Sequence, residues 1–204
     1  MNERERERDR DRDRDRPSDV KVRRILVADL PAHLKDVRDV YQAVFSAEPW
    51  NEDEAAAERY VRRLDTDKER DGFTVAVAED HSGVVGFAVA WTTPAVFPTT
   101  RSYTRVESIV GAARTQAWLC GAREVDELAV HPGVRGSGVG RALLAAVTDD
   151  APAGRCWLLT SAHVDLAVRF YERAGWHRLG TDASGTTVFL SPHHPAFDAS
   201  SAPR

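Results

Sequence analysis

A glycine-rich run, VHPGVRGSGVGRALL at residues 130–144, joins a predicted strand to a predicted helix. Glycine lets the backbone curl closely around a ligand, and the unpaired N–H groups of a helix N-terminus attract negative charge. The run therefore predicts an anion site that suits a pyrophosphate. Its spacing fits neither the nucleotide P-loop, GxxxxGK[ST], nor the dinucleotide pattern GxGxxG, because Arg141 stands where the last glycine of that pattern would be.

The run resembles the acetyl-CoA signature of the GNAT superfamily, R/Q-x-x-G-x-G/A, and follows an apolar-x-Pro exit from a strand. The resemblance implies that acetyl-CoA is the co-substrate. Backbone amides from Gly136 to Arg141 would hold its pyrophosphate, and the main chain from Leu128 to Val130 would pair with its pantetheine arm. The implied cofactor-binding residues are Leu128, Ala129, Val130, Arg135, Gly136, Ser137, Gly138, Val139, Gly140 and Arg141.

A second segment, AVRFYERAGW at 167–176, resembles the family pattern A-x-x-F-Y-x-x-x-G-F/W. Helical spacing predicts a buried stripe of Leu166, Phe170 and Ala174, with Tyr171 about 100° away from Phe170. In the family this tyrosine faces the CoA sulfur, which makes Tyr171 the expected general acid. A phenol with a pKa of about 10 keeps its proton at neutral pH and can give it to a departing thiolate. A packed or surface tyrosine is the alternative.

One position departs from the family pattern. Val164 stands where the family often has an asparagine that bonds to the pantetheine. A polar contact to the cofactor is therefore expected to be lost, unless Asp165 or His163 replaces it.

Transfer to an amine also needs a base, because an alkyl ammonium is mostly charged at pH 7. Strand alternation places Glu124, Asp126, Leu128 and Val130 on one face of the predicted strand and Val125, Glu127 and Ala129 on the other, unless a bulge alters the count. Glu127 shares its face with a small residue and is the first candidate for the base. Glu124 is the second. A solvated or ion-paired role for each acid remains open.

Hydrophobic periodicity predicts an order of strands and helices along the chain. A strand is expected at 20–30, a helix at 32–47, and a second helix to about residue 70 that Asn51 caps. Strands at 73–78 and 84–92 precede an insertion at 94–122 that carries a helix from Tyr103 to Cys120. The remaining strands are expected at 124–130, 156–160, 176–180 and 187–190, and the remaining helices at 138–150 and 166–174.

The resemblance implies one α/β domain at 20–191, with a mixed, mostly antiparallel sheet of six to seven strands flanked by helices and splayed between strands four and five. Residues 1–19 are expected to form a disordered tail of mixed charge, and 192–204 a C-terminal tail. The formal net charge of −4 and the pI near 6.0 argue against a nucleic-acid partner.

No apolar run is long enough for a membrane span, and the two cysteines do not make a disulfide scaffold. The expectation is a cytoplasmic protein without a membrane partner. The seven histidines show no ligand spacing, so no metal is expected.

The implied activity is direct transfer of the acetyl group of acetyl-CoA to a primary amine of a small molecule, in a ternary complex. Two alternatives stay open: acetylation of a protein N-terminus or lysine, and a non-catalytic acyl-CoA-binding module. The sequence does not identify the amine acceptor. Paired subunits are frequent in the family, which makes a homodimer an expectation.

Overall fold

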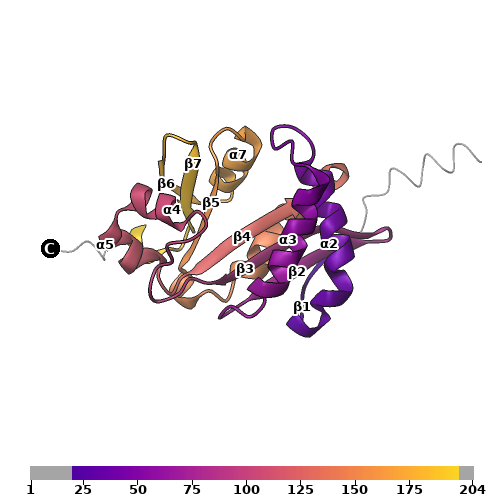
Figure 1. The fold of residues 1–204 in the computed structure, drawn as a ribbon, viewed down its shortest axis with the longest axis horizontal. Coiled ribbons are helices and arrows are strands. Elements are labelled where there is room, and N and C mark those ends of the chain that lie inside the picture. Colours follow the sequence, from indigo (N-terminus) through magenta and orange to yellow (C-terminus); the bar gives the residue numbers. More distant parts are fainter. Residues whose placement is uncertain (1–19, 198–204) are drawn as a thin grey trace, which may run out of the picture.

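A computed structural model describes residues 20–197, so the predicted tail at 1–19 and residues 198–204 of the predicted tail at 192–204 lie outside it. Its seven strands form one sheet in the order β1-β2-β3-β4-β5-β7-β6 (Figure 1). Neighbouring strands are antiparallel except β4 and β5, which run parallel. The expected mixed, mostly antiparallel sheet is confirmed. The strands are β1 (Lys21–Ile25), β2 (Thr74–Asp80), β3 (Gly83–Thr92), β4 (Arg123–Val130), β5 (Cys156–Ser161), β6 (His177–Thr181) and β7 (Thr186–Leu190).

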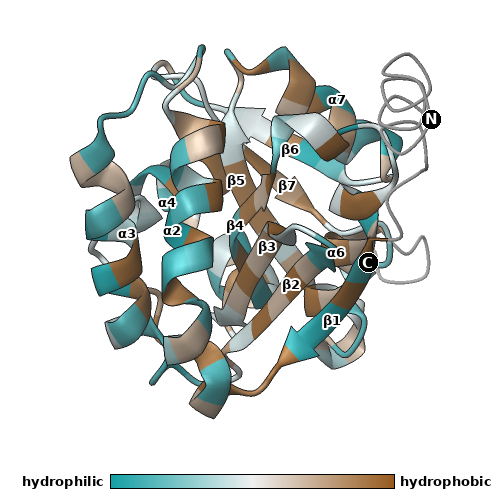
Figure 2. Cartoon of the chain, turned by 90° about the vertical axis from the view of Figure 1, so that its right-hand side faces the viewer, coloured by the Kyte–Doolittle hydropathy of each residue, from teal (hydrophilic) through white to brown (hydrophobic). Residues whose placement is uncertain are grey.

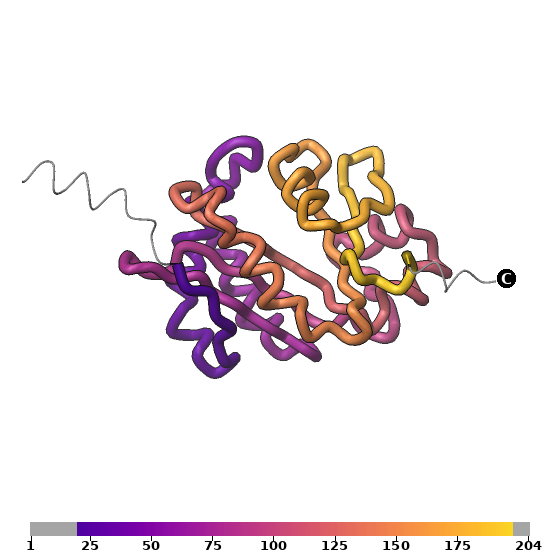
Figure 3. The backbone as a smooth tube through the Cα atoms, turned by 180° about the vertical axis from the view of Figure 1, so that it is seen from behind, coloured from indigo at the N-terminus to yellow at the C-terminus, as the bar shows by residue number. Residues whose placement is uncertain are grey.

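Helices cover both faces of this sheet. On one face, α2 and α3 pack over the first strands, and α4 lies against β6 and β7; on the other, α6 crosses β1 to β4 (Figure 3) and α7 lies against β5 and β6. The inner strands between these layers are largely apolar, whereas the edge strands β1 and β6 are mostly hydrophilic (Figure 2). The helices are α2 (Leu30–Phe45), α3 (Glu54–Asp67), α4 (Tyr103–Val110), α5 (Ala112–Arg114), the π-helix η2 (Thr115–Leu119), α6 (Val139–Thr148) and α7 (Asp165–Arg173).

The first strand is shorter than predicted. β1 ends at Ile25, which pairs with Val75 near the start of β2, so a longer β1 would have almost no partner strand. A 3₁₀ turn at Val27–Asp29 follows, and α2 begins at Leu30. The predicted strand at 20–30 was therefore too long.

The N-cap of α3 is Asp53, and the prediction of Asn51 was wrong. The Asp53 carboxylate accepts a hydrogen bond from the Ala56 N–H at 2.8 Å, while Asp53 itself is extended, as N-cap residues are. Asn51 has a φ of 48°, and its N–H bonds instead to the carbonyl of Ala47. It belongs to the turn that ends the preceding helix.

The segment between β3 and β4 is not the single helix that was predicted from Tyr103 to Cys120. α4 ends at Val110 because Gly111 has a φ of 85° and a ψ of 141°, outside any helical region. α5 and η2 follow. This segment packs its own apolar cluster, which includes Tyr103, Val106 and Leu119, against Trp157.

The sheet opens between β4 and β5. Their pairing has only three steps, from Arg123 opposite Cys156 to Val125 opposite Leu158. Beyond Val125, β4 continues to Val130 with β3 as its only neighbouring strand within residues 20–197. The predicted splay between the fourth and fifth strands is confirmed.

Candidate active site

The gap in the sheet begins at a β-bulge in β4. Glu127 pairs with Val89 and Val125 pairs with Ala90, so Asp126 is an extra residue that no residue of β3 opposes. Directly opposed residues share a face of the sheet. Glu127 therefore lies with Val89, on the face that α2 and α3 cover.

The bulge changes the predicted division of the acids. Strict alternation separates Glu124 from Glu127, but Glu124 opposes Trp91, whose side chain also belongs to the α2 and α3 face. Both carboxylates are thus on one face. Leu128 turns to the opposite face. There it packs with a buried apolar cluster that includes Val139, Leu143 and Leu144 of α6, here named the α6 cluster. The one inserted residue, Asp126, therefore reverses which side chains of β4 face α2 and α3 in the part of the strand before the bulge.

Glu127 is half-buried and has no ion-pair partner among residues 20–197. Its Oε1 accepts a hydrogen bond from the Leu128 N–H at 3.2 Å. Burial raises the pKa of Glu127 to about 8, and the charge of Asp126 adds to this. A carboxylate with a pKa near neutrality is a suitable proton acceptor, since catalytic bases work best when their pKa is close to the working pH.

Glu124 is the centre of a buried hydrogen-bond network. Its Oε2 accepts from the Tyr103 hydroxyl at 2.8 Å, from the Trp91 Nε1–H at 3.1 Å and from the Thr93 hydroxyl at 3.4 Å. The side chain is almost sealed, with the residue 7% exposed, and burial raises the pKa of Glu124 to about 7. These contacts hold β3, β4 and α4 together.

Asp126, the bulged residue, is held by cations. Arg63 of α3 bonds to it at 2.9 Å, and Arg101 lies 3.9 Å away. Arg101 also bonds to the buried Asp67 at 2.8 Å. Burial raises the pKa of Asp126, and the two arginines lower it. The bulge is thereby tied to α3.

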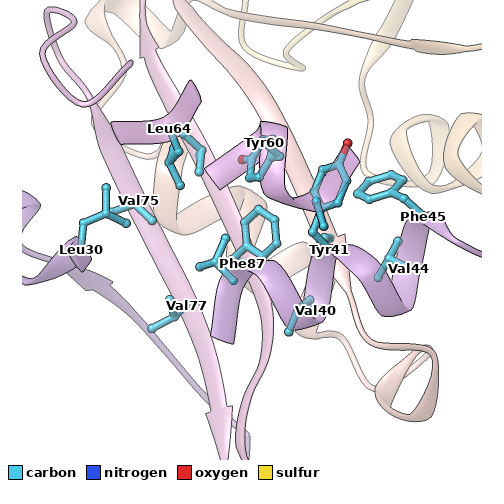
Figure 4. Packing of buried hydrophobic residues seen from close by; sticks show 14 of the residues in the cluster. Leu30, Val40, Tyr41, Val44, Phe45, Tyr60, Leu64, Val75, Val77 and Phe87 are labelled. Atoms are coloured by element: carbon cyan, nitrogen blue, oxygen red, sulfur yellow. The ribbon is translucent and has the colours of Figure 1, made fainter. Parts of the chain in front are cut away.

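A surface pocket of about 520 Å³ lies between the end of α2 and the start of α3. Tyr41 and Tyr60 line it, stacked with their ring centroids 4.5 Å apart and 18° between their planes. Figure 4 shows the two rings side by side beside Phe87 of β3. Burial raises the pKa of the Tyr41 hydroxyl, and the charge of Glu127 raises it further.

Sequence reasoning missed most of this pocket. Tyr41 lies within the helix predicted at 32–47 but was given no role, and neither were Glu52, Tyr60 and Arg63. No motif marks these residues. Their common location depends on how the two helices meet, and only the single tyrosine among the charged residues of α3 could have drawn attention to them.

The glycine-rich loop has the backbone that its sequence predicts. Gly136 and Gly138 have φ values of 82° and 89°, a region that suits glycine. Gly138 is the N-cap of α6 and has no side chain to bond the first N–H groups of the helix. Those groups are free to bind an anion. A Cβ on either glycine would meet nothing within 4 Å, so the loop surface is open.

Two neighbours of the loop contact other elements. The Arg135 Nε–H bonds to the Val130 carbonyl at 3.4 Å, and Arg141 bonds to the Arg173 carbonyl at the end of α7 at 3.0 Å. The Ser137 hydroxyl bonds to the Val134 carbonyl. These bonds fix the loop against β4 and α7.

Tyr171 is buried, 8% exposed, among the rings of Phe170, Trp176 and Phe189. Burial raises the pKa of its hydroxyl, and Glu127 raises it further. The hydroxyl therefore keeps its proton at neutral pH. Tyr171 packs in the apolar cluster under α6, so it lies on the opposite face of the sheet from Glu127. Glu127 still affects the pKa of Tyr171, because β4 and β5 are not paired beyond Val125 and no strand lies between the two residues there.

The predicted buried stripe of α7 was wrong at Leu166, whereas Phe170 and Ala174 are partly buried against the apolar core, as predicted. Leu166 is 62% exposed, and the buried residues of the helix are Val168 and Tyr171. Phe170 packs sideways onto α6, where a Cβ on Gly140 would lie 3.3 Å from its ring. The side of α7 that faces the sheet therefore differs from the side predicted by the spacing of its apolar residues. Val164 is buried at the N-cap of α7 and makes no side-chain capping bond.

Residues 71–178 match the sequence profile of the acetyltransferase (GNAT) domain. The chain belongs to the GNAT acetyltransferase family. Both predictions, the family and its class of acyltransferases, are confirmed. The GNAT profile spans β2 to the start of β6 and so contains β4, the glycine-rich loop and α7, while α2, α3 and the pocket between them precede it.

Similar proteins agree with this GNAT membership. A crystal structure of a protein from Pyrococcus horikoshii is 20% identical and covers 85% of this chain and 98% of its own, with a TM-score of 0.59. The PaiA N-acetyltransferase from Thermoplasma acidophilum, solved in complex with coenzyme A, is 14% identical, with 84% and 98% covered and a TM-score of 0.51. These likenesses show the fold.

A curated relative, an uncharacterized protein from Mycobacterium leprae, is 36% identical over 72 residues, which is 33% of this chain. The matched part spans about a fifth, 20%, of that relative's length.

Two further findings concern the described part of the chain. Residues 20–197 contain no group of three or more His, Cys, Asp or Glu side chains placed to hold a metal ion. No helix within these residues combines the length and the apolar character that crossing a membrane requires.

Proposed function

We propose that this GNAT protein transfers the acetyl group of acetyl-CoA to a primary amine of a small molecule. The observation that carries the proposal is the separation of β4 from β5 at the bulge. The glycine-rich N-terminus of α6 lies on one face of the sheet there. Glu127, whose pKa is raised, lies on the other face, which the helices of the pocket cover. The pocket is a local hollow between two helices, which suits a small acceptor better than a protein surface.

The donor side of the proposal rests on the loop from Val134 to α6. Backbone N–H groups at 136–141 would bind the pyrophosphate, since the glycines expose them and no side chain caps the helix. The free edge of β4 beyond Val125, at 128–130, would pair with the pantetheine arm. That PaiA binds coenzyme A on the same fold supports this assignment.

The acceptor side supplies the proton chemistry. Glu127 takes a proton from the amine, directly or through water, and the nitrogen attacks the thioester carbonyl. The new C–N bond forms as the C–S bond breaks, and Tyr171 gives its proton to the departing thiolate. Three donors already bond to Oε2 of Glu124, and the residue is only 7% exposed, which favours Glu127 as the base.

Release of free CoA thiol from acetyl-CoA, followed with a panel of small amines, tests the proposal. Amine-dependent release in the wild type and a kcat lower by about 10²- to 10⁴-fold in Tyr171→Phe are expected, because general acid catalysis is worth that much. Binding of CoA to Tyr171→Phe should be unchanged. Tight CoA binding without turnover of any amine would instead identify a non-catalytic binding module.

A further inference from the structure

Arg63 belongs to a cluster of charges that joins α3 to the bulge in β4. It bonds to Asp126 at 2.9 Å and lies 3.6 Å from Asp67. Asp67 also bonds to Arg70 at 2.6 Å and to Arg101 at 2.8 Å, and Arg101 lies 3.9 Å from Asp126. Within residues 20–197, two largely buried carboxylates thus share three guanidinium groups, so the cluster carries one positive charge in excess.

The cluster ends one residue before Glu127, which directly follows Asp126 in β4 and lies on the face of the sheet that α3 covers. Glu127 is half-buried and forms no ion pair of its own within residues 20–197. Partly buried charges are weakly screened, so they act on a neighbouring carboxylate more strongly than surface charges do. The guanidinium of Arg63 therefore favours the ionised form of Glu127, and the carboxylate of Asp126 disfavours it.

The other groups around Glu127 have smaller electrostatic effects on it. Burial is the main cause that raises its pKa to about 8; the charge of Asp126 raises the pKa further, and the charge of Arg63 lowers it. The remaining titratable groups of the surrounding elements are Glu52 before α3, Tyr41 of α2, Tyr60 of α3 and Tyr171 of α7. Burial raises the pKa of all three tyrosines, so they stay neutral at neutral pH, and only Glu52 adds a charge. The two strongest charges on Glu127 are therefore the two members of one ion pair.

We infer that Arg63 and Asp126 are positioning residues that act through Glu127: their opposed charges, fixed at the bulge, set the pH at which Glu127 becomes a proton acceptor. The catalytic consequence rests on the proposed function, in which Glu127 is the base. The alternative is that the ion pair only ties α3 to β4. A purely structural tie does not distinguish the loss of the positive charge from the loss of the negative one.

Removing each charge separately tests the inference, because the two should act in opposite directions. Arg63→Met should raise the pKa of Glu127 by roughly one pH unit, and Asp126→Asn should lower it by about as much. The double variant should return the pKa towards that of the wild type, and Arg63→Lys, which keeps the charge, should change it little. Arg62→Met is the matched control, since the Arg62 side chain is 67% exposed and lies 3.8 Å from Glu58 instead.

Two readouts follow the titration of Glu127. The first is the ¹³C chemical shift of its carboxyl carbon in protein labelled at that carbon of glutamate, assigned by comparison with Glu127→Gln; it needs no substrate. The second is kcat/KM of each variant relative to the wild type across pH, with acetyl-CoA and one small amine, because the titration of the amine itself cancels in this ratio. Urea unfolding of each variant shows whether it is folded.

Opposite displacements of the titration in Arg63→Met and Asp126→Asn, by both readouts, are the expected result. Displacements in the same direction, or titrations that stay at the wild-type pH, would overturn the inference while acetyl transfer by the wild type stands. If Arg63→Met does not fold, Asp126→Asn alone decides, because a purely structural tie predicts no fall in the pKa of Glu127. Opposite displacements of the ¹³C titration in a protein that acetylates no amine would uphold the inference and contradict the proposed function.

Discussion

Glu127 and Tyr171 lie on opposite faces of the sheet, yet the Glu127 carboxylate raises the pKa of the Tyr171 hydroxyl. They interact because β4 and β5 separate beyond Val125, so no packed strand screens one from the other. On the proposed assignment, the base Glu127 and the acid Tyr171 therefore belong to opposite faces of the sheet near the place where β4 and β5 separate. Direct transfer in a ternary complex needs this arrangement.

The pH profile of Glu127→Gln tests the base. The pKa of Glu127 is about 8, so its carboxyl group is mostly protonated below that pH and becomes a base as the pH rises. The amine acceptor also titrates and would obscure this effect in the wild type alone. We therefore expect the ratio of wild-type to Glu127→Gln kcat/KM to increase up to about pH 8, reaching about 10²- to 10⁴-fold. A ratio that is independent of pH would contradict the assignment.

Gly138→Ala should weaken CoA binding. Gly138 has a φ of 89°, where an alanine is strained by about 1 kcal/mol, and it begins the helix whose N–H groups would bind the pyrophosphate. Gly83→Ala is the matched control, because Gly83 also has a positive φ of 117° and open space around its Cβ position, but lies in the β2–β3 hairpin. Both variants should lose similar stability by denaturant unfolding. Only Gly138→Ala should lose affinity for CoA in calorimetry.

Asp53→Ala should lower the free energy of unfolding by about 1 kcal/mol, because it removes the side-chain bond to the Ala56 N–H at the start of α3. Asn51→Gly should leave stability unchanged or raise it, since glycine tolerates the φ of 48° at that position. Urea unfolding of the two variants compares them directly. If Asn51→Gly were the more damaging change, the capping assignment would be wrong.

Glu124 should make the protein less stable as the pH rises. Its ordinary pKa of 4.5 applies when the chain is unfolded, and its folded pKa is about 7, so between these values the unfolded state releases a proton that the folded state keeps. The contribution of Glu124 to the free energy of unfolding is therefore complete below pH 4.5. It decreases as the pH rises and is lost above about pH 7. The loss is about 1.4 kcal/mol for each pH unit, or roughly 3 kcal/mol in all.

Glu124→Gln removes this titration and keeps an oxygen for the Tyr103 hydroxyl to bond. The variant should therefore gain stability relative to the wild type between pH 5 and pH 8, as measured by urea unfolding at both values. Parallel pH dependence of the two proteins would show that Glu124 is ionised throughout.

The glycine-rich run and the segment around Tyr171 could be predicted because each combines a local backbone requirement with a fixed spacing. Gly136 and Gly138 have the positive φ values that the run implied, and the mixed sheet with its splay between β4 and β5 followed from the family resemblance. Such features depend on neighbours in the sequence. The GNAT profile rests on the same residues.

The arrangement of the acids could not be predicted in the same way. The bulge at Asp126 depends on how β4 pairs with β3, which alternation within one strand does not report. The exposure of Leu166 has a similar origin, since α7 packs against both β5 and α6 and turns Tyr171 inward. The pocket at Tyr41 and Tyr60 joins two helices through tertiary packing alone.

The open seam between β4 and β5 also bears on how turnover ends. On the proposed assignment, spent CoA departs past α6 and α7, whereas the acetylated amine departs past α2 and α3 on the reverse side of the sheet. On that assignment neither product would obstruct the exit of the other, which predicts product release without an obligatory order. The two substrates would then enter, and the two products leave, from opposite faces of the sheet rather than through one shared opening.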